Sequence, residues 1–290
     1  MSRYQGSKVN PSRFSWSQVK FYLILLPVAL FMLLPIIYIF TTAFKPADEL
    51  FKFPPSFFVV NPTVDNFKLL FERMSTTTVP AMRYVFNSVI VAILTVLLSV
   101  GLSVSAAYIL SKKEFRGKKL LFEINTLALM FIPIAVSIPR FIIIVNLGLT
   151  DRFIANILPI IAMPVGLFLM KQNIDQVPDS LLEACYIDGG RELDILFRVI
   201  IPMTKPAIAT IAILSFQSAW GNIEASVLYI NNESLKTFAY YISSFTAGTT
   251  GGIGQGLAAA SALIMFLPNL IIFIFMQSKV MDTMANSGIK

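Results

Sequence analysis

The residues best placed for chemistry stand in the polar segment from Gln176 to Pro206, which lies between long apolar stretches. A short helix is expected over Pro178–Asp188, because the missing N–H of a proline costs nothing in the first helical turn. Gly189 and Gly190 then permit the positive φ that ends a helix and turns the chain. A second amphipathic helix is predicted from the apolar spacing at Leu193, Leu196, Phe197 and Ile200.

Other reactive or metal-binding residues are scarce. The sequence has one Cys and no His, which excludes a disulfide framework and a zinc site built on histidines or several cysteines. Paired carboxylates within the membrane and the pattern G-x-x-x-x-G-K-[ST] are both absent, so neither a membrane-embedded enzyme nor an ATP site is supported. The stretch Gly254-x-Gly256-x-x-Ala259 is like a dinucleotide fingerprint, but no strand is expected before it. We therefore expect no covalent chemistry and no bound cofactor or metal.

The composition is that of an integral membrane protein, with 56% hydrophobic residues, 13% charged residues and a mean hydropathy of +0.74. The net charge of +7 could suggest nucleic acid. The basic residues border apolar stretches, however, and the strongest cluster, residues 111–119 with five basic residues and one acid, sets orientation by the positive-inside rule. A helix needs about 20 residues to cross the bilayer core. Six spans are expected, at residues 21–44, 84–110, 120–147, 153–170, 203–220 and 257–276.

These spans predict an all-α protein with one transmembrane domain over residues 1–290. Both termini and the polar loop 171–202 are expected on the cytosolic side, and the third span should bend at Pro133 and Pro139. The glycine-rich stretch 248–256 is expected to be a mobile part of an outer loop over residues 221–256.

The polar loop also carries a family pattern, in Glu183-Ala184-Cys185, Asp188-Gly189, Val199 and Ile201-Pro202. It resembles the EAA loop of permease subunits in binding-protein-dependent ABC importers, written as E-A-A, three residues, G, nine residues, I, one residue and L-P. The spacing fits without a gap, although Cys185, Val199 and Ile201 replace the usual Ala, Ile and Leu. The resemblance implies an all-α integral membrane protein with six transmembrane helices, a cytosolic EAA coupling helix and the type I ABC importer permease fold, in a bacterial cytoplasmic membrane.

In that family the EAA helix docks in a cleft of a separate ATPase subunit. The implied partners are a second homologous permease, two ATPase subunits that carry ATP and Mg, an extracellular solute-binding protein and the lipid bilayer. Glu183 is implied as the acidic contact, Ala184 as the point of close approach and Gly189 as the turn, while Asp188 either braces the turn or touches the partner. The full set implied for coupling is Glu183, Ala184, Cys185, Asp188, Gly189 and Phe197.

Weaker matches point to one branch of the family. They are Ile138-Pro139, Leu147-Gly148-Leu149, Trp220 with Asn222, Pro268 and the ending Ser287-Gly288-Ile289-Lys290. They resemble the second permease of carbohydrate importers of the maltose-transporter type, which implies transport of a sugar or oligosaccharide. An ABC permease for a peptide, amino acid or polyamine shares the EAA loop and is the alternative. A secondary transporter is disfavoured, because the two halves show no matching broken or charged spans.

Ionisable residues inside spans are candidates for the substrate path. Glu123 lies one turn from Lys119, which favours local pairing. Arg140 is interpreted as facing the cavity and favouring an acidic saccharide, with pairing to a partner subunit or to lipid headgroups as the alternative. Trp220 and Asn222 are further candidates for this path. Trp220 and tyrosines 229, 240 and 241 suggest stacking on a sugar, but an interfacial aromatic belt is the favoured interpretation of these aromatic residues. The resemblance further implies that the glycine-rich loop contacts the binding protein, at Gly251, Gly252 and Gly254.

Overall fold

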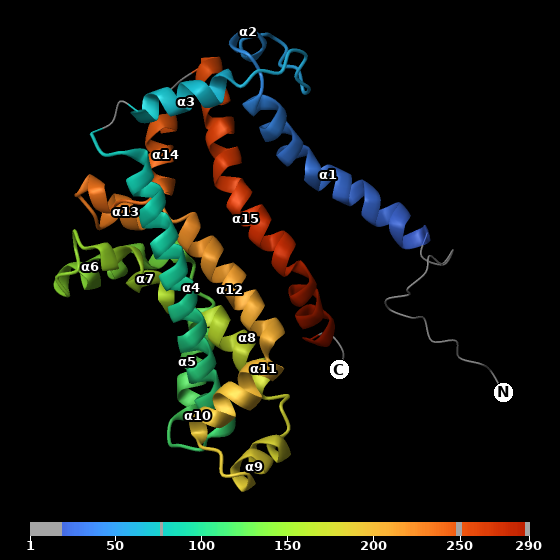
Figure 1. Cartoon of the computed structure of the whole chain (residues 1–290), viewed down its shortest axis with the longest axis vertical. Coiled ribbons are helices and arrows are strands. Elements are labelled where there is room, and N and C mark those ends of the chain that lie inside the picture. Colours follow the sequence, from blue (N-terminus) through green and yellow to red (C-terminus); the bar gives the residue numbers. More distant parts are fainter. Residues whose placement is uncertain (1–18, 76–77, 248–250, 288–290) are drawn as a thin grey trace. The chain divides into compact units, whose positions relative to one another are not determined.

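A computed structural model describes residues 19–75, 78–247 and 251–287, and within these ranges the chain forms helices and no strand (Figure 1). The expectation of an all-helical protein is therefore confirmed. Contacts divide the chain into two compact units, residues 1–68 with 250–263 and residues 69–249 with 264–290. The single permease domain over residues 1–290 stays a prediction. The last three residues of the expected C-terminal pattern lie outside the described ranges.

In the first unit, one buried side-chain amide binds the backbone at the end of the long first helix. Asn66 lies in the first turn of α3 (Asp65–Ser75), and its Nδ2 donates to the carbonyl oxygens of Ala43 at 2.9 Å and Lys45 at 2.8 Å. These carbonyls end the long helix α1 (Val19–Ala43) and have no partner further along it. Asn66 therefore fixes the chain where it leaves α1. The same unit contains α2 (Ala47–Leu50) and the first turns of α15 (Gly251–Ser287).

The second unit is built on α4 (Ala81–Lys112), with α8 (Pro164–Ile174) and α12 (Lys205–Trp220) packed along it (Figure 1). One face of α4 buries small polar side chains, namely Asn87, Ser88, Thr95, Ser99 and Ser103. Small residues let helix backbones approach closely in a membrane. Gly166 of α8 is an example, because an added Cβ there would lie 2.9 Å from the Ser103 Oγ.

The six predicted spans have helical counterparts, and within the described residues three of these are single long helices: α1, α4 and residues 253–277 of α15. The other three are pairs of helices that meet at an angle. The fourth span consists of η3 (Phe153–Asn156), α7 (Leu158–Ile161) and α8, with a bend of 44°. In the fifth, residues 192–203 meet α12 and α13 (Glu224–Leu228) at 83°.

The third span bends at Pro133, as expected, and the bend is a break between two helices. Helix α5 (Lys118–Ala128) stops short, and the turn η2 (Pro133–Val136) with α6 (Ser137–Asn146) continues at 110° to it. Pro133 explains the break, because a proline disfavours the helical conformation of the residue before it, and Ile132 is extended with a ψ of 132°. The expected bend at Pro139 is absent, since Pro139 lies in the first turn of α6, where its missing N–H has no helical partner.

The expected outer stretch over residues 221–256 is not an irregular loop, and its place on the outer side stays a prediction. Most of it is helical, in α13, η5 (Glu233–Leu235) and α14 (Phe238–Ala247). Helix α15 begins at Gly251, so Gly251, Gly252 and Gly254 belong to its first two turns rather than to a loop. Residues 248–250 of the glycine-rich stretch lie outside the described ranges.

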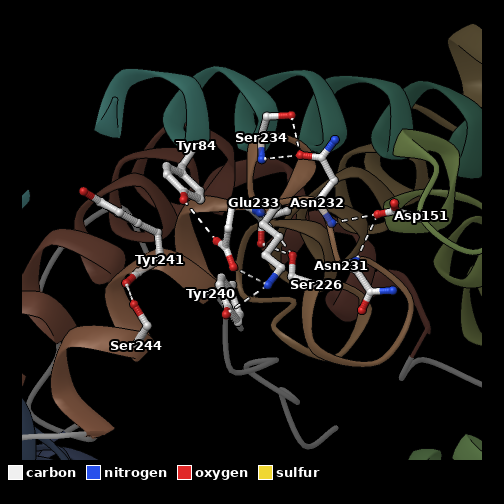
Figure 2. A network of polar contacts seen from close by, with 12 residues as sticks. Tyr84, Asp151, Ser226, Asn231, Asn232, Glu233, Ser234, Tyr240, Tyr241 and Ser244 are labelled. Carbon is white, nitrogen blue, oxygen red and sulfur yellow. Dashed lines mark hydrogen bonds and ion pairs between the residues drawn. The ribbon is translucent and has the colours of Figure 1, made fainter. Parts of the chain in front are cut away.

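A polar network fixes η5 to its surroundings (Figure 2). The Glu233 carboxylate accepts hydrogen bonds from the hydroxyl of Tyr84 on α4 at 3.1 Å and from the Nζ of Lys236 at 2.6 Å. On the other side, Asp151 Oδ1 accepts the backbone N–H groups of Asn231 at 3.0 Å and Asn232 at 2.7 Å. This network joins the start of α4 to two segments that are distant in the sequence.

Asn87 is the buried member of this arrangement and gives the first prediction. Its side chain, 1% exposed, donates from Nδ2 to the carbonyl oxygens of Ser234 and Lys236, each at 2.9 Å. Asn87→Ala should lower the stability by about 1–3 kcal/mol, because both carbonyls lose their donor. The unfolding midpoint of detergent-purified protein should fall by several degrees. Asn146→Ala, at an exposed position of α6, is the matched control, and equal effects of the two changes would contradict this role of Asn87.

Candidate functional site

The polar segment after α8 forms the expected short helix, α9 (Asp179–Ile187). Its first turn is bound by Lys112, the last residue of α4. The Lys112 Nζ donates to the carbonyl oxygen of Val177 at 2.6 Å and to Asp179 Oδ1 at 2.7 Å. The Lys112 side chain is 9% exposed, so this lysine lies under the helix rather than in solvent.

The end of α9 is a glycine turn of the Schellman type. The N–H of Gly190 donates to the carbonyl of Cys185 at 2.9 Å, and that of Gly189 donates to Tyr186 at 3.0 Å. Gly189 has the expected positive φ, of +81°, and Asp188 is the C-cap residue. Gly190 needs no positive φ, contrary to the prediction. It is small for another reason, because an added Cβ would lie 2.6 Å from the Cys185 Sγ.

The two faces of α9 differ in exposure. Leu182 is buried and Cys185 packs beside it against the core shared by α4, α8 and α12. Glu183 and Ala184 point away from this core and are exposed, and Ile187 is 85% exposed. The structure therefore places Glu183 and Ala184 on an open surface and Cys185 under it.

The second predicted helix is not regular. It consists of α10 (Glu192–Asp194), a π-helical turn η4 (Ile195–Ile200) and α11 (Ile201–Met203). Pro202 accounts for the wide turn, since its ring clashes with a carbonyl one turn earlier and it lacks an N–H. The expected apolar face is consequently divided: Ile200 is buried, whereas Leu193 and Phe197 are 67% and 63% exposed. The exposed Phe197 lies on the open side, and the predicted pair of Asp194 with Arg198 is present at 3.1 Å.

A cluster of four side chains holds α10 against α4. The Glu192 carboxylate accepts hydrogen bonds from the Tyr108 hydroxyl at 2.6 Å, from the Lys113 Nζ and from the Tyr186 hydroxyl. The Lys113 Nζ also lies 5.8 Å from the ring centres of both tyrosines. The hydrogen bond from Lys113, together with those from the two tyrosines, lowers the pKa of Glu192 from 4.5 to about 2.

Sequence reasoning missed this cluster. It assigned Lys112 and Lys113 to the orientation signal and gave no role to Tyr108, Tyr186 or Glu192. Lys113 and Glu192 are 79 residues apart, and no spacing rule links them. The one available signal was the pair of lysines directly after an apolar span, opposite a loop with several acids.

The candidates for the substrate path lie elsewhere in the second unit. Arg140 on α6 pairs with Glu224 on α13 at 3.4 Å, and Glu224 also accepts the Tyr229 hydroxyl at 3.3 Å. Arg140 lines a cavity of about 360 Å³ whose other walls are apolar, among them Ile144 and Leu158. The ion pair reduces the cost of placing an arginine in this apolar setting. Glu123 forms the expected local pair with Lys119, at 3.9 Å.

Trp220 and Asn222 are engaged within the protein. Trp220 is buried, stacks on Phe216 and donates from Nε1 to the carbonyl of Met265 at 3.2 Å. The Asn222 Oδ1 accepts the N–H of Ala225 at 3.2 Å. The aromatic belt is wrong for Trp220 and for tyrosines 229 and 241, which are all buried. A role of Trp220 and Asn222 in the substrate path stays a prediction.

Known proteins resemble the chain over most of its length. Residues 99–278 match the family described as "Binding-protein-dependent transport system inner membrane component". The "Arabinooligosaccharides transport system permease protein AraQ" of Bacillus subtilis (strain 168) is 27% identical over 282 residues, which cover 96% of this chain and 98% of that protein. The "Trehalose transport system permease protein SugB" of Mycobacterium tuberculosis (strain CDC 1551 / Oshkosh) is 27% identical over 264 residues, with coverages of 90% and 93%.

The fold is also found among solved structures. A chain of "a bacterial ABC transporter involved in the import of the acidic polysaccharide alginate" superposes with a TM-score of 0.73 at 23% identity. The alignment covers 92% of this chain and 99% of that chain.

The Glu192 cluster gives a prediction of pH dependence. Because the pKa of Glu192 is lowered on folding, its contribution to stability is complete above pH 4.5 and is lost as the pH falls towards 2. Glu192→Gln should lower the unfolding midpoint by about 2–4 °C at pH 7, equivalent to roughly 1 kcal/mol for a half-exposed group, and by less at pH 3.5.

The matched control for this prediction is Glu114→Gln. The Glu114 side chain is 91% exposed and forms a surface pair with Lys118, so its loss should change the midpoint little at either pH. A difference between wild type and Glu192→Gln that grows on acidification would contradict the assignment.

Proposed function

The chain belongs to the family of binding-protein-dependent transport system inner membrane components, and from that premise we propose that it is the permease subunit of an ABC importer that carries a saccharide. With a second, homologous permease it would form the translocation path. The sequence has no phosphate-binding loop of its own, so the energy would come from ATP bound with Mg to two separate ATPase subunits. An extracellular solute-binding protein would deliver the substrate.

The exposed face of α9 is the observation that carries this proposal. Glu183 forms no ion pair in the described part of the chain, and Ile187, one helical turn further along, is an exposed apolar side chain. An exposed carboxylate without an ion-pair partner of its own is suited to pairing with a basic residue of a docked partner. We assign the ATPase contact to Glu183, Ala184 and Phe197, and we assign the turn that shapes it to Asp188, Gly189 and the partly buried Cys185.

The membrane surface supports the proposed assembly. Most side chains of α1 are exposed and apolar, and so are the outward residues of α4 such as Ile93 and Leu97. Surfaces of this kind face lipid or another membrane subunit. We place the chain in a bacterial cytoplasmic membrane with both termini and α9 on the cytosolic side. The first turns of α15, with Gly251, Gly252 and Gly254, would then lie on the outer side, where the binding protein docks.

A saccharide is proposed as the substrate because both named relatives carry sugar substrates in their names, arabinooligosaccharides and trehalose. The pair of Arg140 and Glu224 is our choice for the contact in this chain, with Trp220 and Asn222 shaping the path beside it. Arg140 offers donors and Glu224 offers acceptors, which together match the hydroxyl groups of a sugar. Because Glu224 balances the charge of Arg140, a preference for acidic saccharides depends on how strongly the two remain paired.

Glu183 tests the importer itself. Glu183→Arg should remove the ATPase from the purified complex, lowering its recovery at least tenfold, because a like charge then faces the basic residue of the partner. Glu114→Arg makes the same charge change at an exposed position and should leave recovery unchanged. The measurement is co-purification from native membranes in mild detergent. If the wild-type protein is recovered alone, the importer assignment is wrong.

Arg140 tests the substrate contact. Arg140→Gln should lower uptake of an acidic saccharide relative to a neutral one by roughly tenfold, the effect of losing a charged hydrogen bond. Glu224→Gln should shift the ratio the other way, since it frees Arg140 from its partner. The exposed Arg152→Gln is the control. Unchanged uptake of every acidic saccharide in both variants would eliminate this contact, and transport of peptides or polyamines instead would redirect the substrate class.

A further inference from the structure

The last residue of α4, Lys112, and the residue that follows it, Lys113, hold α9 at both of its ends. Lys112 binds the start of α9, through the carbonyl of Val177 and the carboxylate of Asp179. Lys113 binds the other side, through Glu192 and, at 3.2 Å, through the hydroxyl of Tyr186 near the end of α9. Two consecutive residues at the end of α4 thus bind α9 near its start and near its end.

Apolar packing closes the space between these polar contacts. Tyr108 of α4 is buried and contacts the same core as Leu182 of α9 and Ile195 of η4, while its hydroxyl reaches Glu192 at 2.6 Å. Tyr108 belongs to α4 and Lys113 directly follows it, and both bind the Glu192 carboxylate. Because Glu192 lies beyond the Gly189–Gly190 turn, the direct contact of Lys113 with α9 itself is the hydroxyl of Tyr186.

The far end of α4 is fixed in the same manner. Tyr84 and Asn87, in its first two turns, bind Glu233 and the carbonyls of Ser234 and Lys236 around η5. The 32 residues of α4 rise about 48 Å, which is more than the thickness of the bilayer core. A displacement of α9 that is passed to α4 would consequently reach the opposite side of the membrane without passing through a loop.

We propose that Lys113 and Glu192, supported by Tyr108, Tyr186 and the Lys112 contacts, are positioning residues that join α9 to α4 as one body and so convert movement of the docked ATPase into movement of α4. This inference rests on the proposed importer function. It assigns these residues no contact with ATP, with substrate or with the ATPase. Their task is to keep the docking surface from tilting independently of the membrane helix that it must move.

Reversing the charges of Lys113 and Glu192 distinguishes the joining of α9 to α4 from the docking of the ATPase. Lys113→Glu and Glu192→Lys should each leave the ATPase bound and hydrolysing ATP, while the amount of saccharide imported per ATP falls about fivefold or more in proteoliposomes, the range of a coupling between sites. The double variant restores an ion pair and should recover the ratio to within about twofold. The reversal of Glu114 and Lys118, a surface pair at 2.7 Å, is the matched control and should not change the ratio in any combination.

The outcomes differ for the two proposals. If the wild-type complex contains no ATPase, the importer function fails and the inference falls with it. If the single variants lose the ATPase, or import with the wild-type ratio, the importer stands and the positioning role is overturned. If the reversed charges prevent insertion, Tyr186→Phe serves instead, because it removes the two hydrogen bonds of the hydroxyl and keeps the ring. This variant must lower the ratio by a smaller factor, and an unchanged ratio would also overturn the role.

Discussion

A bilayer supplies no water to backbone N–H and C=O groups, so each peptide within it must find its hydrogen bonds inside the protein. The long helices α1 and α4 meet this requirement with their own backbone hydrogen bonds. Each break in a bent span, however, leaves backbone groups without a partner in their own helix. Side chains of neighbouring helices supply the missing donors. Near the break between α7 and α8, the Ser99 Oγ donates to the carbonyl of Ile161 at 3.0 Å, and Asn125 Nδ2 donates to that of Pro164 at 3.1 Å. The buried polar face of α4 and the bent shape of its neighbours therefore depend on each other.

Because the bilayer core contains no water, most charged residues lie at the ends of the spans. Their contacts differ from one end of α4 to the other. At one end of α4, lysines bind the carboxylates of Asp179 and Glu192 and hold the exposed surface around Glu183. At the other end, Glu233 and Lys236 bind each other and fix η5. The pair of Arg140 and Glu224 is set among apolar residues in between, and its mutual neutralisation makes that position tolerable. Each of these charges therefore has a partner of opposite sign within the protein.

Much of this arrangement could be predicted from the sequence, because span length, loop charge and glycine turns are local properties. The six helical regions, the end of α9 at Gly189 and the pair of Asp194 with Arg198 were predictable in this way. A bend at Pro133 was predictable too, but its angle of 110° and the wide turn before Pro202 were not, since a proline in an apolar run can start, bend or interrupt a helix. The Glu192 cluster was not predictable at all. Its members come from α4 and the residue after it, from α9 and from α10, and no local pattern links these segments.

The length of α9 has a consequence for biogenesis. Nine residues are too few to form a stable helix alone in water, where about 12–15 are marginal. The contacts that order α9 join residues 65 to 84 positions apart, so they cannot form until the chain has left the ribosome well beyond α8 and α4 has settled in the bilayer. A half-made subunit would consequently present a disordered loop where the finished one presents a shaped surface. Premature assembly with other subunits is disfavoured by this order of events, with no dedicated checkpoint required.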